Sequence, residues 1–338
     1  MLAWHDIFGV PPAVVTIVGM AKNVGKTVTL NYVQKMLHNE GLVFGLTSIG
    51  RDGESFDALT NIAKPLITVQ PGTILATAKK VITNPNQWEH LQDTDYKTPL
   101  GEVVILRAKS LNQVVLAGPS KNRDVQGVLR LLAAWGVRSI LIDGAFDRQS
   151  SADPLVSSQV ILACGATVSR DLQELVQAAK SRVEQLTLPV CSEQYQELSN
   201  TSQAKVITVN AGVPREVSFT TSLLRPAEWA ELFGLDCDAV ILKGAVGDGL
   251  AQVLLQQSRP PQIIVQDGSK IFVNSNLWRQ LKVHQVNFSA VQSICLLGVT
   301  INPTYPGGKG LDAEVLLQKM GEALAPLPVI DIMREAKF

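Results

Sequence analysis

The feature that most constrains the fold is a run of β-branched residues that leads through a glycine-containing loop directly into a helical pattern. Residues 14–18 read Val-Val-Thr-Ile-Val, Gly19 follows, and Gly25-Lys26-Thr27 stand where a helical pattern over 26–40 begins. A strand, a loop and a helix in this order can hold a phosphate group, because loop N–H groups and the helix N-terminus favour anions. The motif therefore predicts a strand, a phosphate-binding loop and a helix.

Each residue type in this loop has an expected role. The N–H groups of residues 22–27 are expected to surround a phosphate, Lys26 to reach the β and γ oxygens, and Thr27 to place its hydroxyl on Mg²⁺. The residues predicted to bind the nucleotide are Gly19, Lys22, Asn23, Val24, Gly25, Lys26, Thr27 and Val28. A chance match to Gly-Lys-Thr is the alternative, and the strand before it and the helix after it argue against chance.

Short apolar runs alternate with helical patterns along the rest of the chain. The expected strands are 14–18, 44–49, 113–117, 140–143, 160–163, 239–242, 263–265 and 294–301. The expected helices are 26–40, 123–135, 171–186, 249–257 and 312–324. This alternation predicts an α/β fold with a doubly wound, mostly parallel sheet. Because residues 188–236 are more polar and irregular, we expect a P-loop nucleotide-binding domain over 1–190 and a second α/β lobe, on the partner or substrate side, over 191–338.

Composition narrows the function classes. The 338 residues include 30 Lys plus Arg and 30 Asp plus Glu, a balance that argues against nucleic-acid binding through a general positive excess. No apolar stretch reaches the roughly 18–20 residues needed to cross a bilayer, so we expect no membrane segment. The cysteine and histidine spacings do not fit a zinc site or a disulfide framework. We therefore expect a folded cytoplasmic protein.

Two strand ends carry acids that could meet the metal of a bound nucleotide. Asp52, with Arg51 and Glu54 beside it, follows the apolar run 44–49, and we expect Asp52 to be a direct or outer Mg²⁺ ligand. A solvated turn built on the neighbouring glycines is the alternative. Asp143 ends the run 140–143, where a buried carboxylate needs a cation or hydrogen-bond donors. The predicted catalytic residues are thus Lys26, Asp52 and Asp143, and the predicted metal ligands are Thr27, Asp52 and Asp143.

Three further strand-end loops, one in the first half of the chain and two in the second, have two interpretations each. Ser120 and Lys121 follow a Gly-Pro turn and either bind an acidic group or begin a helix. In the second half, four charged residues after apolar runs either form a substrate or partner surface or belong to ordinary turns: Lys243, Asp248, Asp267 and Lys270. Asn302 lies in a Gly-x3-Asn-Pro loop that resembles the adenine-side loop of dethiobiotin synthetase. The resemblance implies that the Asn302 amide reads the edge of the base, and it makes Asn302 a further predicted nucleotide-binding residue. Since no Asn-Lys-x-Asp guanine motif follows a late strand, ATP is favoured over GTP.

Several motifs together resemble known families. The Gly-x5-Gly-Lys-Thr loop resembles that of dethiobiotin synthetase and the cobyric-acid-type synthases, and Asp143-Gly144-Ala145 is similar to the synthetase's Glu-Gly-Ala with Asp in place of Glu. A wider set of segments resembles the P-loop subunit of the lysine 5,6-aminomutase reactivase, the family usually called KamB. These segments are 19–27, 46–54, 98–108, 116–124, 142–148, 161–166, 242–248 and 300–308.

The reactivase resemblance implies an ATP-dependent repair factor. Such a factor would use Mg²⁺-dependent ATP binding and hydrolysis to open an adenosylcobalamin-dependent aminomutase and let damaged cobalamin exchange. The resemblance implies the mutase as a partner, with a second reactivase subunit as a further candidate. It also implies that Asp52 or Glu54 senses the γ-phosphate. The alternative from a different class is a dethiobiotin-synthetase-like ligase that uses ATP to activate a substrate carboxylate.

Overall fold

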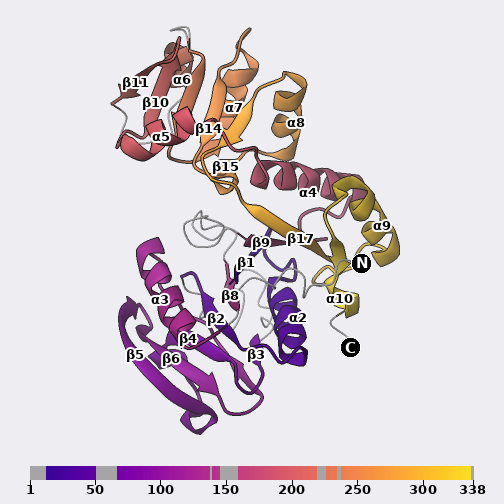
Figure 1. The fold of residues 1–338 in the computed structure, drawn as a ribbon. Coiled ribbons are helices and arrows are strands. Elements are labelled where there is room, and N and C mark those ends of the chain that lie inside the picture. Colours follow the sequence, from indigo (N-terminus) through magenta and orange to yellow (C-terminus); the bar gives the residue numbers. More distant parts are fainter. Residues whose placement is uncertain are drawn as a thin grey trace. The chain divides into compact units, whose positions relative to one another are not determined.

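The computed structural model describes residues 13–50, 67–137, 139–144, 159–218, 226–233 and 237–335 (Figure 1). The chain divides into two compact units: the first comprises Met1–Leu175 and Leu296–Phe338, and the second comprises Val176–Cys295. The chain leaves the first unit within helix α4 (Leu172–Leu186) and re-enters it at strand β17 (Cys295–Asn302). The division thus differs from the expected boundary near residue 190, because the C-terminal segment joins the first sheet instead of ending a second lobe.

The first unit is built on a nine-stranded sheet of described residues with the order β18-β17-β9-β1-β8-β2-β4-β6-β5. Strand β18 pairs in parallel with β17, and neighbouring strands from β9 through β1, β8 and β2 to β4 are also parallel. Strand β6 pairs antiparallel with β4, and β5 pairs antiparallel with β6. Its strands, in chain order, are β1 (Ala13–Gly19), β2 (Phe44–Ser48), β4 (Ile74–Ala78), β5 (Trp88–Thr98), β6 (Gly101–Ala108), β8 (Ser139–Asp143), β9 (Gln159–Gly165), β17 (Cys295–Asn302) and β18 (Val329–Asp331).

Helices cover both faces of this sheet, because alternate side chains of each strand point to opposite faces. In β8, Leu141 packs with the buried face of α2 (Lys26–Asn39), whereas Ile140 and Ile142 pack with that of α3 (Asn122–Ala134). Figure 1 shows α2 and α3 on opposite sides of the strands. The expected α/β fold with a mostly parallel sheet covered on both faces is therefore confirmed at this level.

The first unit has smaller elements around this sheet. They are the short antiparallel pair β3 (Ile67–Val69) and β7 (Asn112–Val114), the 3-10 turns η1 (Lys79–Val81) and η2 (Pro85–Gln87), and helices α9 (Ala313–Leu324) and α10 (Ile332–Glu335). The prediction of a strand over 113–117 is wrong in part. The observed strand β7 ends at Val114 and pairs with β3 instead of joining the large sheet.

The second unit is a smaller α/β layer structure with the strand order β11-β10-β12-β14-β16. Its elements are α5 (Glu193–Thr201), β10 (Val206–Asn210), β11 (Val213–Val217), α6 (Pro226–Phe233), β12 (Ala239–Leu242), β13 (Val246–Gly247), α7 (Asp248–Leu255), β14 (Gln262–Val265), η3 (Gly268–Lys270), β15 (Ile271–Phe272), α8 (Ser275–Val283) and β16 (Phe288–Ala290). Residues of α6, α7 and α8 pack on one face of this sheet and residues of α5 on the other. Strands β12, β14 and β16 are parallel, so this unit repeats the strand-and-helix alternation of the first.

Candidate functional site

The loop between β1 and α2 has the backbone of a tight turn into a helix. Gly25 is the N-cap of α2 with φ 96°, and Asn23 also has a positive φ of 60°. Glycine adopts such angles without steric cost, and asparagine tolerates them better than most other residues. The first helical hydrogen bond runs from Thr29 N to Gly25 O at 2.9 Å. The predicted strand, loop and helix are therefore present at the predicted residues.

Lys26 reaches from the start of α2 to the neighbouring strand end. Its Nζ donates to the Gly144 carbonyl oxygen at 2.8 Å, across 118 residues of sequence. This contact is available because β8 pairs directly with β1, with Asp143 opposite Ile17. The lysine charge thus lies at the carboxyl ends of two adjacent parallel strands, which is where ligands bind in open α/β sheets.

Asp143 lies between the ends of β1 and β2. It is partly buried, and its backbone oxygen accepts a hydrogen bond from Ile49 N at 3.2 Å. Asp143 precedes Gly144, so its carboxylate and the Lys26 amine belong to the same strand end. Lys26 Nζ thus contacts the residue that follows the predicted acid Asp143, whereas Asp52, with Arg51 and Glu54, lies outside the described residues.

The other predicted loop residues differ in exposure. Lys22 and Asn23 are exposed, Thr27 and Val28 are partly buried, and the Val24 side chain is part of the core with 1% exposed. Gly19 is closely surrounded: an added Cβ would lie 2.8 Å from Val24 Cγ2. In this loop Val24 therefore has a packing role through its side chain, and any contact with a ligand would come from its backbone.

Asn302 lies beside the loop with its amide already bonded. Its side chain is 7% exposed, and its Oδ1 accepts hydrogen bonds from Thr304 N at 2.9 Å and from Thr304 Oγ1 at 2.7 Å. Its Nδ2 donates to Asn23 O at 3.3 Å. The amide that the sequence assigned to a base edge is thus bonded to the loop itself.

Two further groups at this site are not marked by any sequence motif. Thr167, just after β9, donates from Oγ1 to Lys22 O at 2.9 Å. Arg170 lies with its Cζ 3.7 Å from the centre of the Tyr305 ring, so that a cation–π pair joins the loops after β9 and β17. No local pattern marks these residues, because the partners are far apart in sequence.

The segment that precedes α3 crosses the ends of two strands. Ala117 O accepts from Ala78 N at 3.0 Å, and Pro119 O accepts from Gly50 N at 2.8 Å. Gly118 packs so closely that an added Cβ would lie 1.9 Å from the Ser48 carbonyl oxygen. Ser120 and Lys121 follow as exposed residues, and Lys121 is the N-cap of α3. They begin a helix, as one of their two interpretations predicted.

The strand-end charges of the second unit are bonded within the chain. Asp248 accepts from Asn274 N at 2.9 Å and from Asn274 Nδ2 at 2.8 Å, and Lys243 Nζ donates to Ser202 O. Asp267, with 2% exposed, accepts from Ser269 N at 2.8 Å and lies 3.7 Å from Lys270 Nζ. These contacts favour the ordinary-turn interpretation for these loops.

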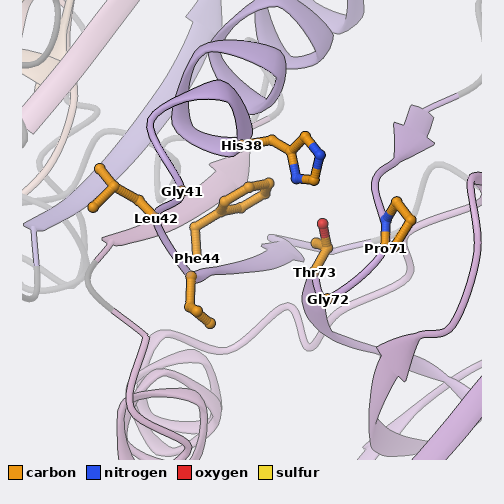
Figure 2. Close-up of a pocket in the computed structure, with 8 residues that line it drawn as sticks. His38, Gly41, Leu42, Phe44, Pro71, Gly72 and Thr73 are labelled. Carbon is orange, nitrogen blue, oxygen red and sulfur yellow. The ribbon is translucent and has the colours of Figure 1, made fainter.

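A pocket of about 220 Å³ lies at the opposite end of α2 from the Gly-Lys-Thr loop. Figure 2 shows His38 above Thr73, with the Phe44 ring on the left and Pro71 on the right. Its walls are mainly apolar and lack a carboxylate or a lysine. The pocket is therefore separate from the residues that the sequence predicted to act on a nucleotide.

Comparisons with known proteins identify no relative. No family model, curated protein or solved structure matches the chain. Within the described residues, no group of three or more His, Cys, Asp or Glu side chains could hold a metal ion, and no helix has the length and hydropathy to cross a membrane.

Proposed function

We propose that the chain is a P-loop NTPase that binds Mg²⁺-ATP at the β1–α2 loop. The observation that carries the proposal is the bond of Lys26 Nζ to Gly144 O, next to Asp143. This bond holds a lysine of a Gly-Lys-Thr turn at the end of the adjacent strand, beside a carboxylate. A positively charged amine, loop N–H groups and a strand-end carboxylate are the complement expected for a nucleotide phosphate and its magnesium ion.

The roles of these residues follow from their chemistry. The N–H groups of residues 22–27 would bind phosphate oxygens, and Lys26 would exchange the Gly144 carbonyl for the β and γ oxygens. The Thr27 hydroxyl and the Asp143 carboxylate would hold Mg²⁺, Asp143 through water, with Asp52 as a further candidate. When bound, Mg²⁺ neutralises charge that develops on the transferring phosphoryl group.

We further propose that this NTPase reactivates an adenosylcobalamin-dependent aminomutase. The support is the set of segments that resemble the KamB family, which extends from residue 19 to residue 308. ATP binding would order loops at the strand ends, and hydrolysis would release them. The mutase would respond to these two states of the loops by opening and closing around damaged cobalamin. A second reactivase subunit is a further candidate partner.

The test uses an inactivated mutase. The protein, with any partner subunit encoded beside it, is mixed with ATP, Mg²⁺, fresh adenosylcobalamin and the mutase, and recovery of mutase activity is measured with time. We expect recovery only with ATP, and none with the Lys26→Ala variant. Recovery that is indifferent to ATP or to Lys26 would contradict the proposal. ADP release that depends instead on a small carboxylate would indicate the ligase alternative.

A further inference from the structure

Two successive carbonyl groups of the β1–α2 loop accept hydrogen bonds from distant side chains. Lys22 O accepts from Thr167 Oγ1 at 2.9 Å, and Asn23 O accepts from Asn302 Nδ2 at 3.3 Å. The donors are 145 and 279 residues away in sequence. They come from the two nearest strands on one side of β1, since the sheet order there is β17-β9-β1.

These bonds determine how the loop presents its N–H groups. In a trans peptide the carbonyl oxygen and the following N–H point in opposite directions. Fixing Lys22 O toward Thr167 therefore directs the Asn23 N–H away from Thr167, and fixing Asn23 O toward Asn302 directs the Val24 N–H away from Asn302. The positive φ of Asn23 belongs to the same arrangement, since asparagine tolerates the left-handed region.

Asn302 is itself held firmly in place. Thr304 donates twice to its Oδ1, and only 7% of the residue is exposed. The backbone around it is close on both sides: an added Cβ on Gly165 would lie 2.6 Å from Asn302 O, and one on Gly25 would lie 3.4 Å from Asn302 Cβ. One turn into α2, Thr29 Oγ1 lies 2.8 Å from Thr300 Oγ1 of β17. Strand β17 thus supports both the loop and the first turn of the helix.

We infer that Thr167 and Asn302 are positioning residues for phosphate binding, which turn the loop carbonyls outward so that the loop N–H groups are available to an anion. This inference rests on the proposed nucleotide site and deepens it. It also replaces the role suggested by sequence for Asn302. A side chain that reads a base edge needs its amide for the base, whereas the Asn302 amide is bonded to Asn23 and Thr304.

The test separates phosphate binding from base recognition by comparing ATP with inorganic tripolyphosphate, which has no base. Calorimetry with Mg²⁺ measures the affinity of each ligand for the wild type and for Thr167→Val, Thr167→Ser and Asn302→Leu. The valine variant removes the hydroxyl donor with little change in shape, and the serine variant restores it. The leucine variant removes the amide at similar size and adds no charge beside the anion site. Thr187→Val is the matched control, because it removes a threonine-to-carbonyl bond of 2.8 Å in the second unit.

We expect Thr167→Val and Asn302→Leu each to weaken the binding of ATP and of tripolyphosphate by the same factor, roughly tenfold for one lost hydrogen bond that orients the loop. Thr167→Ser and Thr187→Val should bind like the wild type. Loss of ATP affinity with unchanged tripolyphosphate affinity in Asn302→Leu would overturn the inference in favour of a base-reading role. Wild-type affinity of Thr167→Val for both ligands would overturn it as well, even if Asn302→Leu failed to fold. A wild type that binds neither ligand would instead refute the proposed nucleotide site, and the inference with it.

Discussion

Both units contain a parallel strand that ends in a glycine-containing loop with a lysine, but they use the charged groups of that loop differently. In the first unit, Lys26 extends from the loop after β1 and bonds to one backbone oxygen of the next strand end. In the second unit, the loop after β14 contains Asp267, which is buried, bonded to Ser269 N and paired with Lys270 at 3.7 Å. In the second loop an aspartate and a lysine of the same loop pair with each other, whereas Lys26 of the first loop bonds to a neighbouring strand end.

Arg182 extends this contrast. It comes from α4, and its Nη1 donates to Ile271 O at 2.8 Å and to Gln185 Oε1 at 3.2 Å. Burial lowers the pKa of Arg182 to about 10, and the negative charge of Asp267 opposes that shift. The hydrogen-bond acceptors of Arg182 and the Asp267 carboxylate stabilise its charge in this buried environment. A strand-end lysine or aspartate therefore indicates a ligand site only where neighbouring elements leave the charged side chain accessible.

The largest expected effect is on ATP hydrolysis, which should depend on Lys26 and not on Lys270. Lys26→Ala removes the charge directed at the β and γ phosphates, so ATP hydrolysis should fall by at least about 1,000-fold. Lys270→Ala breaks an ion pair inside the second unit and should leave hydrolysis unchanged. Phosphate release assays and calorimetry with Mg²⁺-ATP measure both variants. Unchanged ATP affinity and turnover in Lys26→Ala would show that the β1–α2 loop is not the nucleotide site.

The next effect concerns stability. Arg182→Met leaves Ile271 O without its donor and Asp267 with one positive neighbour fewer, so the free energy of unfolding of the second unit should fall by about 3 kcal/mol. Hydrogen exchange of the amides of β12 and β14 reports this loss, and ATP affinity should not change. Lys319→Met is the control, because its pair with Glu322 is exposed to solvent and contributes little to stability. Equal exchange rates in the Arg182 variant and the wild type would show that the buried charge is not structural.

The smallest effect concerns the metal. Asp143→Asn keeps the side-chain shape but removes its negative charge, so the Mg²⁺ concentration for half-maximal hydrolysis should rise by about tenfold. Asp312→Asn is a suitable control, since the Asp312 side chain caps α9 and asparagine caps equally well. Identical Mg²⁺ titration curves for Asp143→Asn and the wild type would exclude Asp143 from the metal site.

Local sequence predicted much of the first unit and part of the second. The observed helices α2, α3, α4, α7 and α9 lie within two residues of the expected ends, because apolar spacing identifies them. Local sequence did not predict the hairpin of β5 and β6. The edge strand β5 carries exposed charged residues, such as Glu89 and Asp93, that obscure its alternation. Short polar helices such as α5 escaped for a similar reason, since only Ser199 is buried in it.

The sequence by itself determined that β1, its loop and α2 follow one another, and that an apolar strand ends at Asp143. These are local properties, set by β-branched residues, by glycine at a positive φ and by the helical pattern after Lys26. Only the tertiary structure decided that β17 and β18 join the first sheet and that Thr167 and Asn302 support the loop. Strand partners are chosen by packing and by available backbone hydrogen bonds across hundreds of residues, and no local pattern encodes that choice.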